Sequence, residues 1–176
     1  VRLAYPNEGN SLPQKLKIDG SKIIINDFTG NKLTLLDPNQ SGDDVNYLSI
    51  PSPIDNSVTA DFTVDANNNI WFTNWLFQQG GVLVKFNQNG YLDSVAGSDE
   101  QSLPLLDFVK IYELPKTLLT PNGATISDDG TIWLADTTSS SFFNFDPITK
   151  EFIQYVTADP ILDTYGNQTG IVKSPI

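Results

Sequence analysis

A pattern of 11 residues occurs three times in this sequence, at positions 17–27, 64–74 and 126–136. Each copy places Asp, Asn or Gly between two apolar runs, and each ends in a short polar residue: Asp27, Asn74 or Asp136. Two more apolar runs follow every copy. Apolar runs of this length separated by turn residues predict β-strands, so each repeat is predicted to hold four short antiparallel strands.

The spacing of the copies indicates the architecture. Asp27 and Asn74 are 47 residues apart, and Asn74 and Asp136 are 62 residues apart. Four-stranded units with a period of about 40–50 residues are typical of a β-propeller, an all-β fold in which each repeat forms one blade. A β-sandwich is the alternative, but it does not predict a period of four strands. The predicted blades are residues 12–51, 58–115 and 120–157.

The longer spacing of the second pair is explained by an insertion at 88–107, between the third and fourth strands of the second blade. Ser98–Gln101 could cap a short helix before Leu103, whereas Pro104 favours a loop, and both alternatives stay open. In the third blade, Asp129-Gly130 predicts a hairpin with a type I′ turn, in which both central residues have positive φ.

The apolar pattern within the strands fits stacked blades. The second strands contain Ile23–Ile25 and Ile132–Leu134, which are apolar on successive residues. Such strands are expected where neighbouring sheets cover both faces. The outer strand 152–156 is more mixed, as expected for an edge in contact with water.

The two ends of the chain are predicted to belong to neighbouring blades. Residues 1–11 resemble the outer strand of a preceding blade and its crossover, and 158–176 resemble a crossover into a next blade whose first strand lies near or beyond Ile176. A propeller ring closes with about 4–8 blades, and three are visible here. We therefore expect the chain to be a fragment of a longer propeller or to complete its ring with another chain.

Composition excludes several function classes. The chain has 21 Asp and Glu against 10 Lys and Arg, a formal net charge of -11, which disfavours nucleic acid as a partner. No apolar run approaches the ~20 residues that cross a bilayer, so no membrane insertion is expected. Cys and His are both absent, which removes disulfides, thiolate zinc sites, Cys nucleophiles and a His general base. The acidic, Cys-free surface rich in Thr, Asn and Ser fits an extracellular or cell-envelope protein, with the cytoplasm as the alternative.

Two stretches carry a resemblance to known propellers. PNGATISDDGTIWLADT, from Pro121 to Thr137, resembles the blade signature of SMP-30/gluconolactonase-like propellers. NIWFTN, VKFNQNG and YELP in the second blade resemble the streptogramin B lyase (virginiamycin B lyase) propellers and the related NHL repeats. The resemblance covers about residues 12–156. It implies a propeller, whereas it specifies activity poorly because one fold hosts many functions.

The resemblance implies two kinds of chemistry. Streptogramin lyases use a His general base near Mg²⁺, and this chain has no His. SMP-30-like lactonases hold a divalent cation with carboxylate and Asn side chains, and the Asn of their Pro-Asn-Gly motif falls on Asn122. The matching position of the second blade is Ala60, with Asp61 beside it. Asn122, and Asp61 with it, are therefore candidates for binding Ca²⁺ or Mg²⁺, which prefer oxygen ligands. Alternatively, Asn122 is a turn residue.

Other repeated residues have a structural interpretation. Asp27, Asn74 and Asp136 occupy the same place in the three blades, one in each, and such repetition favours a turn-capping role over a metal or catalytic site. Trp71 and Trp133 occupy matching positions, so packing between blades explains them.

Trp75-Leu76-Phe77 has no counterpart in the other blades and is predicted to lie in a loop after the second strand. Large apolar side chains in a loop indicate a pocket or a partner surface, so Trp75 and Phe77 are candidates for ligand or partner binding, with Asp61. Packing over the neighbouring blade is the alternative.

These observations favour a binding module that has a site for a small-molecule ligand or for a protein partner. The alternative is a divalent-metal-dependent lactonase or C–O lyase whose other site residues lie in further blades. A third hypothesis is a structural repeat domain.

Overall fold

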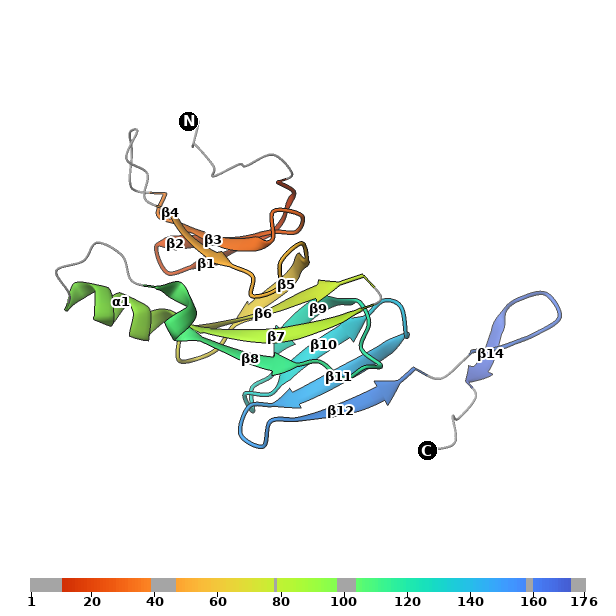
Figure 1. Cartoon of the computed structure of the whole chain (residues 1–176). Coiled ribbons are helices and arrows are strands. Elements are labelled where there is room, and N and C mark those ends of the chain that lie inside the picture. The colour runs from red at the N-terminus through yellow and green to blue at the C-terminus, as the bar shows by residue number, and fades with distance from the viewer. Residues whose placement is uncertain (1–10, 39–46, 78, 98–103, 158–159, 172–176) are drawn as a thin grey trace.

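The chain forms three antiparallel sheets of four strands each, which follow one another in space in the order of the sequence (Figure 1). This computed structural model describes residues 11–38, 47–77, 79–97, 104–157 and 160–171. Within each sheet the strand order is the sequence order, so every strand pairs with the next strand in the chain. The prediction of an all-β propeller architecture with four-stranded blades is confirmed.

The strand bounds define three blades. Blade 1 contains β1 (Pro13–Asp19), β2 (Lys22–Asp27), β3 (Lys32–Leu36) and β4 (Tyr47–Pro51). Blade 2 contains β5 (Val58–Val64), β6 (Asn69–Leu76), β7 (Gly80–Asn87) and β8 (Val109–Glu113). Blade 3 contains β9 (Pro121–Ile126), β10 (Ile132–Asp136), β11 (Ser141–Asp146) and β12 (Glu151–Val156).

A further hairpin follows blade 3. It contains β13 (Pro160–Leu162) and β14 (Gln168–Ile171), and it projects away from the three sheets in Figure 1. The sequence predicted a crossover over 158–176 with no strand before its end. The hairpin differs from that prediction, because Asp163 and Asn167 form a tight turn at which the chain reverses.

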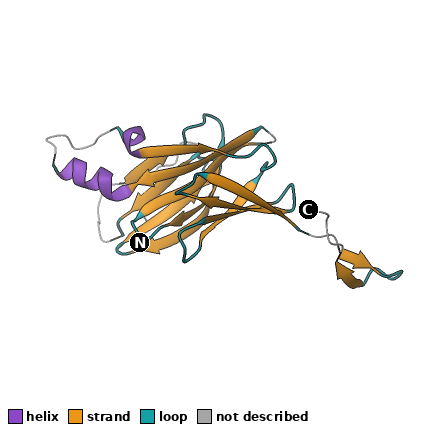
Figure 2. Ribbon diagram, turned by 90° about the horizontal axis from the view of Figure 1, so that it is seen from below, coloured by secondary structure: helices purple, strands orange, loops and turns teal. Residues whose placement is uncertain are grey.

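The insertion in blade 2 contains an α-helix that sequence reasoning missed. Helix α1 (Gln88–Ala96) follows β7 directly, and the 3-10 helix η1 (Leu105–Phe108) precedes β8. The Asn87 side chain accepts a hydrogen bond from the Gly90 N–H and caps α1. The predicted cap at Ser98–Gln101 lies outside the described residues. In Figure 2 the helix lies at one end of the sheets and the β13–β14 hairpin at the other.

The hairpin at Asp129-Gly130 is confirmed, but its turn type is not the predicted one. Gly130 has φ +85°, whereas Asp129 is not among the described residues with positive φ. The Gly130 N–H donates to the Ser127 carbonyl at 2.9 Å, and the Ser127 N–H donates to the Thr131 carbonyl at 3.0 Å. The loop therefore has three residues, with a glycine in the left-handed region after the turn, and needs only one positive φ.

Two apolar clusters join the blades. The first lies between blades 1 and 2 and includes Ile24, Leu33, Phe62, Phe72 and Phe86, and Tyr91 of helix α1 packs against it. The second lies between blades 2 and 3. Its buried members are Trp71, Leu83, Leu114, Leu118, Ala124, Ile132, Leu134, Phe143 and Phe145. Each cluster contains side chains from both of the blades it joins, which explains why the inner strands are apolar on successive residues.

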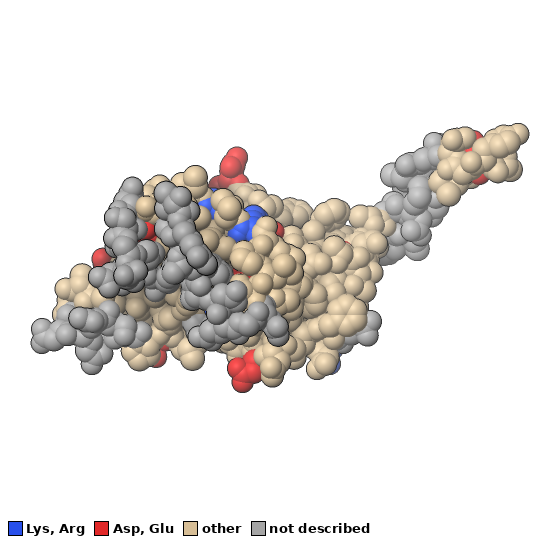
Figure 3. Space-filling model, turned by 90° about the horizontal axis from the view of Figure 1, so that it is seen from above, with Lys and Arg blue, Asp and Glu red and all other residues tan. Residues whose placement is uncertain are grey.

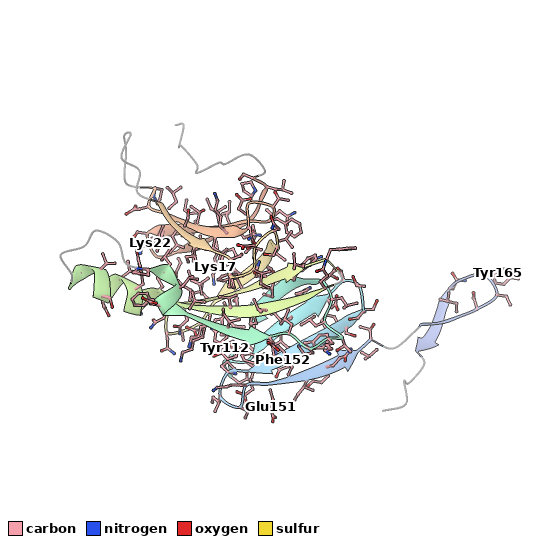
Figure 4. The ribbon with its side chains drawn as sticks, viewed as in Figure 1. Lys17, Lys22, Tyr112, Glu151, Phe152 and Tyr165 are labelled. Atoms are coloured by element: carbon pink, nitrogen blue, oxygen red, sulfur yellow. The ribbon has the colours of Figure 1, made fainter. Side chains whose placement is uncertain are left out.

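Aromatic contacts extend the second cluster toward the outer strands. Tyr112 of β8 stacks on Trp71 with ring centroids 5.8 Å apart, and Phe145 lies 4.8 Å from Tyr112 and 4.6 Å from Phe152. Figure 4 shows Tyr112 and Phe152 close together at the junction of blades 2 and 3. The outer strands of blades 2 and 3 therefore take part in the contact between these blades, as the inner strands do.

No helix among the described residues is long and apolar enough to span a membrane. In Figure 3 the visible basic side chains lie near one another on one part of the surface, and the acidic ones are scattered.

Candidate functional site

Each blade has two ends. At the turn end, the first strand is joined to the second and the third to the fourth; in blade 2 the second of these connections contains α1 and η1. At the crossover end, the second strand finishes and the chain enters from the preceding blade. Asp27, Asn74 and Asp136 lie at the crossover end, as the last residue of β2 or β10 or near the end of β6.

These three residues hold the entering chain against the second strand of their own blade. Asp27 accepts hydrogen bonds from the N–H groups of Leu12 at 2.7 Å and Gly30 at 2.9 Å. The Asn74 amide donates to the Val58 carbonyl at 3.0 Å. Their role is structural, as the repetition predicted.

Asp136 accepts hydrogen bonds from several groups around the end of β10. It accepts from the N–H of Leu119 at 2.8 Å, of Thr120 at 3.0 Å and of Thr138 at 3.0 Å, and from the Ser139 hydroxyl at 2.7 Å. Burial raises the pKa of this carboxyl, but the hydrogen bonds to the charged form outweigh it and lower the pKa to about 2.

The first strand of every blade contains a β-bulge beside these residues. The register shifts between Pro13 and Lys15 in β1, between Thr59 and Phe62 in β5, and opposite Ala135–Asp136 in β9. A bulge redirects the side chains next to it. Asp61 and Asn122 both lie at such bulges, and no residue pattern in the sequence indicates where the bulges fall.

Asp61 links three blades. Its Oδ1 forms an ion pair of 2.6 Å with Nζ of Lys15 in blade 1, and its Oδ2 accepts from the Ala124 N–H of blade 3 at 2.8 Å. Lys15 also donates to the Phe62 carbonyl at 3.2 Å. Both oxygens of Asp61 are therefore bonded within the protein. Its predicted role in ligand binding remains a prediction.

Asn122 is exposed, and its amide donates to the Thr137 hydroxyl at 3.1 Å. Among the residues that the structure describes, no group of three or more His, Cys, Asp or Glu could hold a metal ion. A Ca²⁺ ion requires about 6–8 oxygen ligands. The described residues do not fit a complete Ca²⁺ or Mg²⁺ site.

Trp75 and Leu76 are strand residues, which corrects the predicted loop. Trp75 pairs with Gly81 and Leu76 with Gly80, so β6 continues beyond Asn74. Gly81 permits this pairing, since a Cβ there would lie 2.4 Å from the Asn74 carbonyl oxygen and from Cβ of Trp75.

Trp75 and Phe77 have different surroundings. The Trp75 ring is buried and packs edge-on against Phe28 of blade 1 at 6.2 Å, as the packing alternative predicted. Its indole N–H is buried without a hydrogen-bond partner among the described atoms. Phe77, in the turn after β6, is 68% exposed. The predicted binding role therefore has an accessible side chain only at Phe77.

A cavity of about 500 Å³ opens at the crossover end of blade 2. It lies between the β6–β7 hairpin and the chain that leaves β8 for blade 3. Its walls are apolar apart from Gln79, Glu113 and Lys116. The lining residues are Ile54, Leu76, Gln79, Gly80, Gly81, Val82, Glu113, Leu114, Lys116 and Leu119. Sequence reasoning identified Leu76 as part of an unusual segment but did not identify the other walls, which come from three separate stretches.

A second cavity of about 480 Å³ lies at the turn end, between blades 2 and 3. Asp65, Asp128, Asp129 and Asp146 lie around it with Lys85 and Trp71. The Trp71 indole donates to Asp65 at 2.9 Å, and Nζ of Lys85 lies 5.2 Å from the centroid of the Trp71 ring. Asp65 and Lys85 thus both contact the Trp71 ring at this cavity.

Comparison with solved structures identifies a similar fold. Virginiamycin B lyase from Staphylococcus aureus superposes with a TM-score of 0.62 at 15% sequence identity. The match covers 86% of this chain and 43% of the lyase chain, so this chain spans less than half of the lyase's length. A streptogramin B lyase structure matches with a TM-score of 0.40 at 16% identity, over 93% of this chain and 62% of that one.

No family model matches the sequence, and no curated protein matches it. The similarity at this level of identity concerns the fold, and it confirms the predicted resemblance to streptogramin lyase propellers in architecture. The chain has the β-propeller fold, and its described residues form three four-stranded blades.

Proposed function

We propose that this protein is a binding module that holds a small ligand, or a side chain of a protein partner, in the cavity at the crossover end of blade 2. The cavity itself is the observation that supports the proposal. Its volume of about 500 Å³ lies within the range of about 300–1,000 Å³ of small-molecule sites. Such sites combine apolar walls with a few polar groups, and this one has that composition.

The lining residues indicate the ligand's chemistry. Leu76, Val82 and Leu119 provide apolar contact, while Glu113 and Lys116 at the same cavity offer one charge of each sign. We therefore expect ligands with an aliphatic or aromatic body and an ammonium or carboxylate group. Phe77 follows Leu76 in the chain and is exposed, so it adds apolar surface beside the cavity.

The proposal is tested by screening small aromatic and aliphatic acids and amines by NMR on ¹⁵N-labelled protein. We expect shift changes in the amides of residues 79–82 and 113–119. Leu119→Trp should fill the cavity and remove these changes. Ile148→Trp, at an exposed position of the turn end, is the matched control and should leave them intact. Compounds that bind elsewhere, or that bind Leu119→Trp equally well, would contradict the proposal.

The alternative proposal is a divalent-metal-dependent lactonase or C–O lyase, favoured by the exposed Asn122 at its bulge. The additional oxygen ligands would come from outside the described residues. Calorimetric titration with Ca²⁺ and Mg²⁺ separates the two proposals. The alternative requires binding that is lost in Asn122→Ala, whereas the binding module requires none.

A further inference from the structure

The walls of the cavity at the crossover end of blade 2 are held by two of the polar residues that recur in the blades. The N–H of Ile54 donates to Oδ1 of Asn74 at 3.2 Å, and the N–H of Leu119 donates to Oδ2 of Asp136 at 2.8 Å. The two crossover chains that border the cavity are therefore fixed to the second strands of blades 2 and 3. A wall that is already ordered lowers the entropy that a ligand loses on binding.

The charged side chains at this cavity have no partner within the protein. Glu113 ends β8 and Lys116 follows three residues later, and both are exposed and line the cavity. They form no ion pair with each other, and neither side chain has a hydrogen-bond or ion-pair partner among the residues that the structure describes. Lys15 and Asp61, by contrast, pair at 2.6 Å. One carboxylate and one ammonium group are thus available to a ligand.

Two opposite charges at one cavity discriminate between ligands by sign. A ligand with only a carboxylate is attracted to Lys116 and repelled by Glu113, and a ligand with only an ammonium group meets the reverse. A ligand with both groups is attracted to both side chains. Three residues of chain span at most about 11 Å, so the two charges lie within reach of one small molecule.

The remaining walls define the body of such a ligand. Leu76, Val82 and Leu119 line the cavity with apolar surface. The volume of about 500 Å³ is sufficient for a small molecule. An amino acid with an apolar side chain combines an apolar body with one ammonium group and one carboxylate, which is the set of groups that these walls match.

We infer that the ligand of this cavity is a zwitterion of the apolar amino-acid class. Its ammonium group lies at Glu113, its carboxylate lies at Lys116, and its side chain lies against the apolar walls. The inference rests on the proposed binding function, and it narrows the expected ligands from those with either charged group to those with both.

Leucine and two of its derivatives test the inference by NMR titration of the ¹⁵N-labelled protein. Leucine has both charges, N-acetyl-leucine has only the carboxylate, and leucine methyl ester has only the ammonium group. We expect leucine to shift the amides of residues 79–82 and 113–119. It should bind about 5-fold more tightly than either derivative, because a charge contact at an exposed position contributes modestly.

Removing one protein charge at a time should change the order of the three ligands. Glu113→Gln should weaken the binding of leucine by about 5-fold and strengthen that of N-acetyl-leucine, because the repulsion of its carboxylate is removed. Lys116→Gln should also weaken leucine binding, but it should strengthen that of leucine methyl ester. Glu151→Gln and Lys110→Gln make the same charge changes at exposed positions outside the cavity and should leave the order unchanged.

The outcomes separate this inference from the proposed function. Equal binding of the three ligands, unchanged in Glu113→Gln and Lys116→Gln, would refute the preference for a zwitterion and leave the cavity as a binding site. Tightest binding of either derivative by the parent protein would also refute it. If none of the three shifts these amides while other compounds of the screen do, the inference is wrong and the proposed function stands. If no compound does, both are wrong.

Discussion

The two ends of the blades differ in the range of their hydrogen bonds. At the turn end, Asp65 accepts from the N–H groups of Asn67 and Asn69 and from the Trp71 indole, all within six residues. Asp163 in the β13–β14 hairpin accepts in the same way from Tyr165 and Asn167. At the crossover end, Asp61 bonds to Ala124, 63 residues away, and Asn74 to Asn31, 43 residues away. The turn end is built locally, while the crossover end connects blades.

This difference separates the contacts that every blade repeats from the contacts that are particular to one blade. The turn-end pattern recurs because the same short sequence forms it wherever it occurs. At the crossover end the Asp or Asn near the end of the second strand recurs as well, but contacts to other blades, such as those of Asp61 and Asn74, differ from blade to blade. The proposed cavity lies at that varied end.

The largest predicted effect is at the crossover end of blade 3. Asp136→Ala should destabilise the protein by about 3 kcal/mol, since it leaves the buried Thr120 N–H and the partly buried N–H groups of Leu119 and Thr138 without this acceptor. Urea denaturation measures this change. Asn122→Ala, which loses one exposed hydrogen bond, is the control and should change stability by less than about 0.5 kcal/mol. Equal effects of the two substitutions would refute the assigned role of Asp136.

Acidification should weaken the same contacts by a smaller amount. The pKa of Asp136 is about 2 in the folded protein against an ordinary value of 3.8, so the unfolded chain takes up the proton first as pH falls. The stabilisation is therefore complete above about pH 4 and is lost as pH falls toward 2. Urea midpoints measured across this range should fall less steeply in Asp136→Asn than in the parent protein.

Asp61→Ala tests the link between blades. We expect a loss of about 2 kcal/mol, because the Ala124 N–H is left unpaired in a buried position. Lys15→Ala should cost less, about 1 kcal/mol or below, since the Lys15 side chain is 42% exposed and its ion pair is partly screened by water. The order of the two losses is the test, and the reverse order would assign the stabilisation to the ion pair.

The turn end should give the smallest change. Asp65→Ala should cost about 1 kcal/mol, because most of the N–H groups that it releases can bond to water. Burial raises the pKa of Asp65, but hydrogen bonds from Trp71, Asn69 and Asn67 to the charged form together outweigh it, so the pKa lies below its ordinary value. If Asp65→Ala destabilised the protein as much as Asp136→Ala, the distinction between the two ends would not hold.

The fold could be predicted from the sequence because its signals are local and repeated. The matching Trp71 and Trp133, and the polar residue that ends each copy, indicate the blades from the sequence alone. Helix α1 was missed because its first turn, Gln88-Asn-Gly90, has the composition of a loop and depends on the Asn87 cap.

The candidate site was harder to predict. The two bonds of Asp61 depend on Lys15 and Ala124, which the sequence places 46 and 63 residues away. The cavity walls come from three stretches that meet only after the blades pack. Residue patterns within one blade do not show which residues of other blades they will contact.

The three tryptophans give this fold a set of optical reporters, two in the interior and one nearer the surface. Trp71 is buried with its indole N–H bonded to Asp65, and Trp75 is buried against Phe28. Trp133 is half-buried against Tyr155 at the open end of the stack. Since indole emission depends on local polarity, variants that retain a single tryptophan would report separately on the interior of the stack and on its end. Fluorescence could therefore follow blade 2 and blade 3 separately.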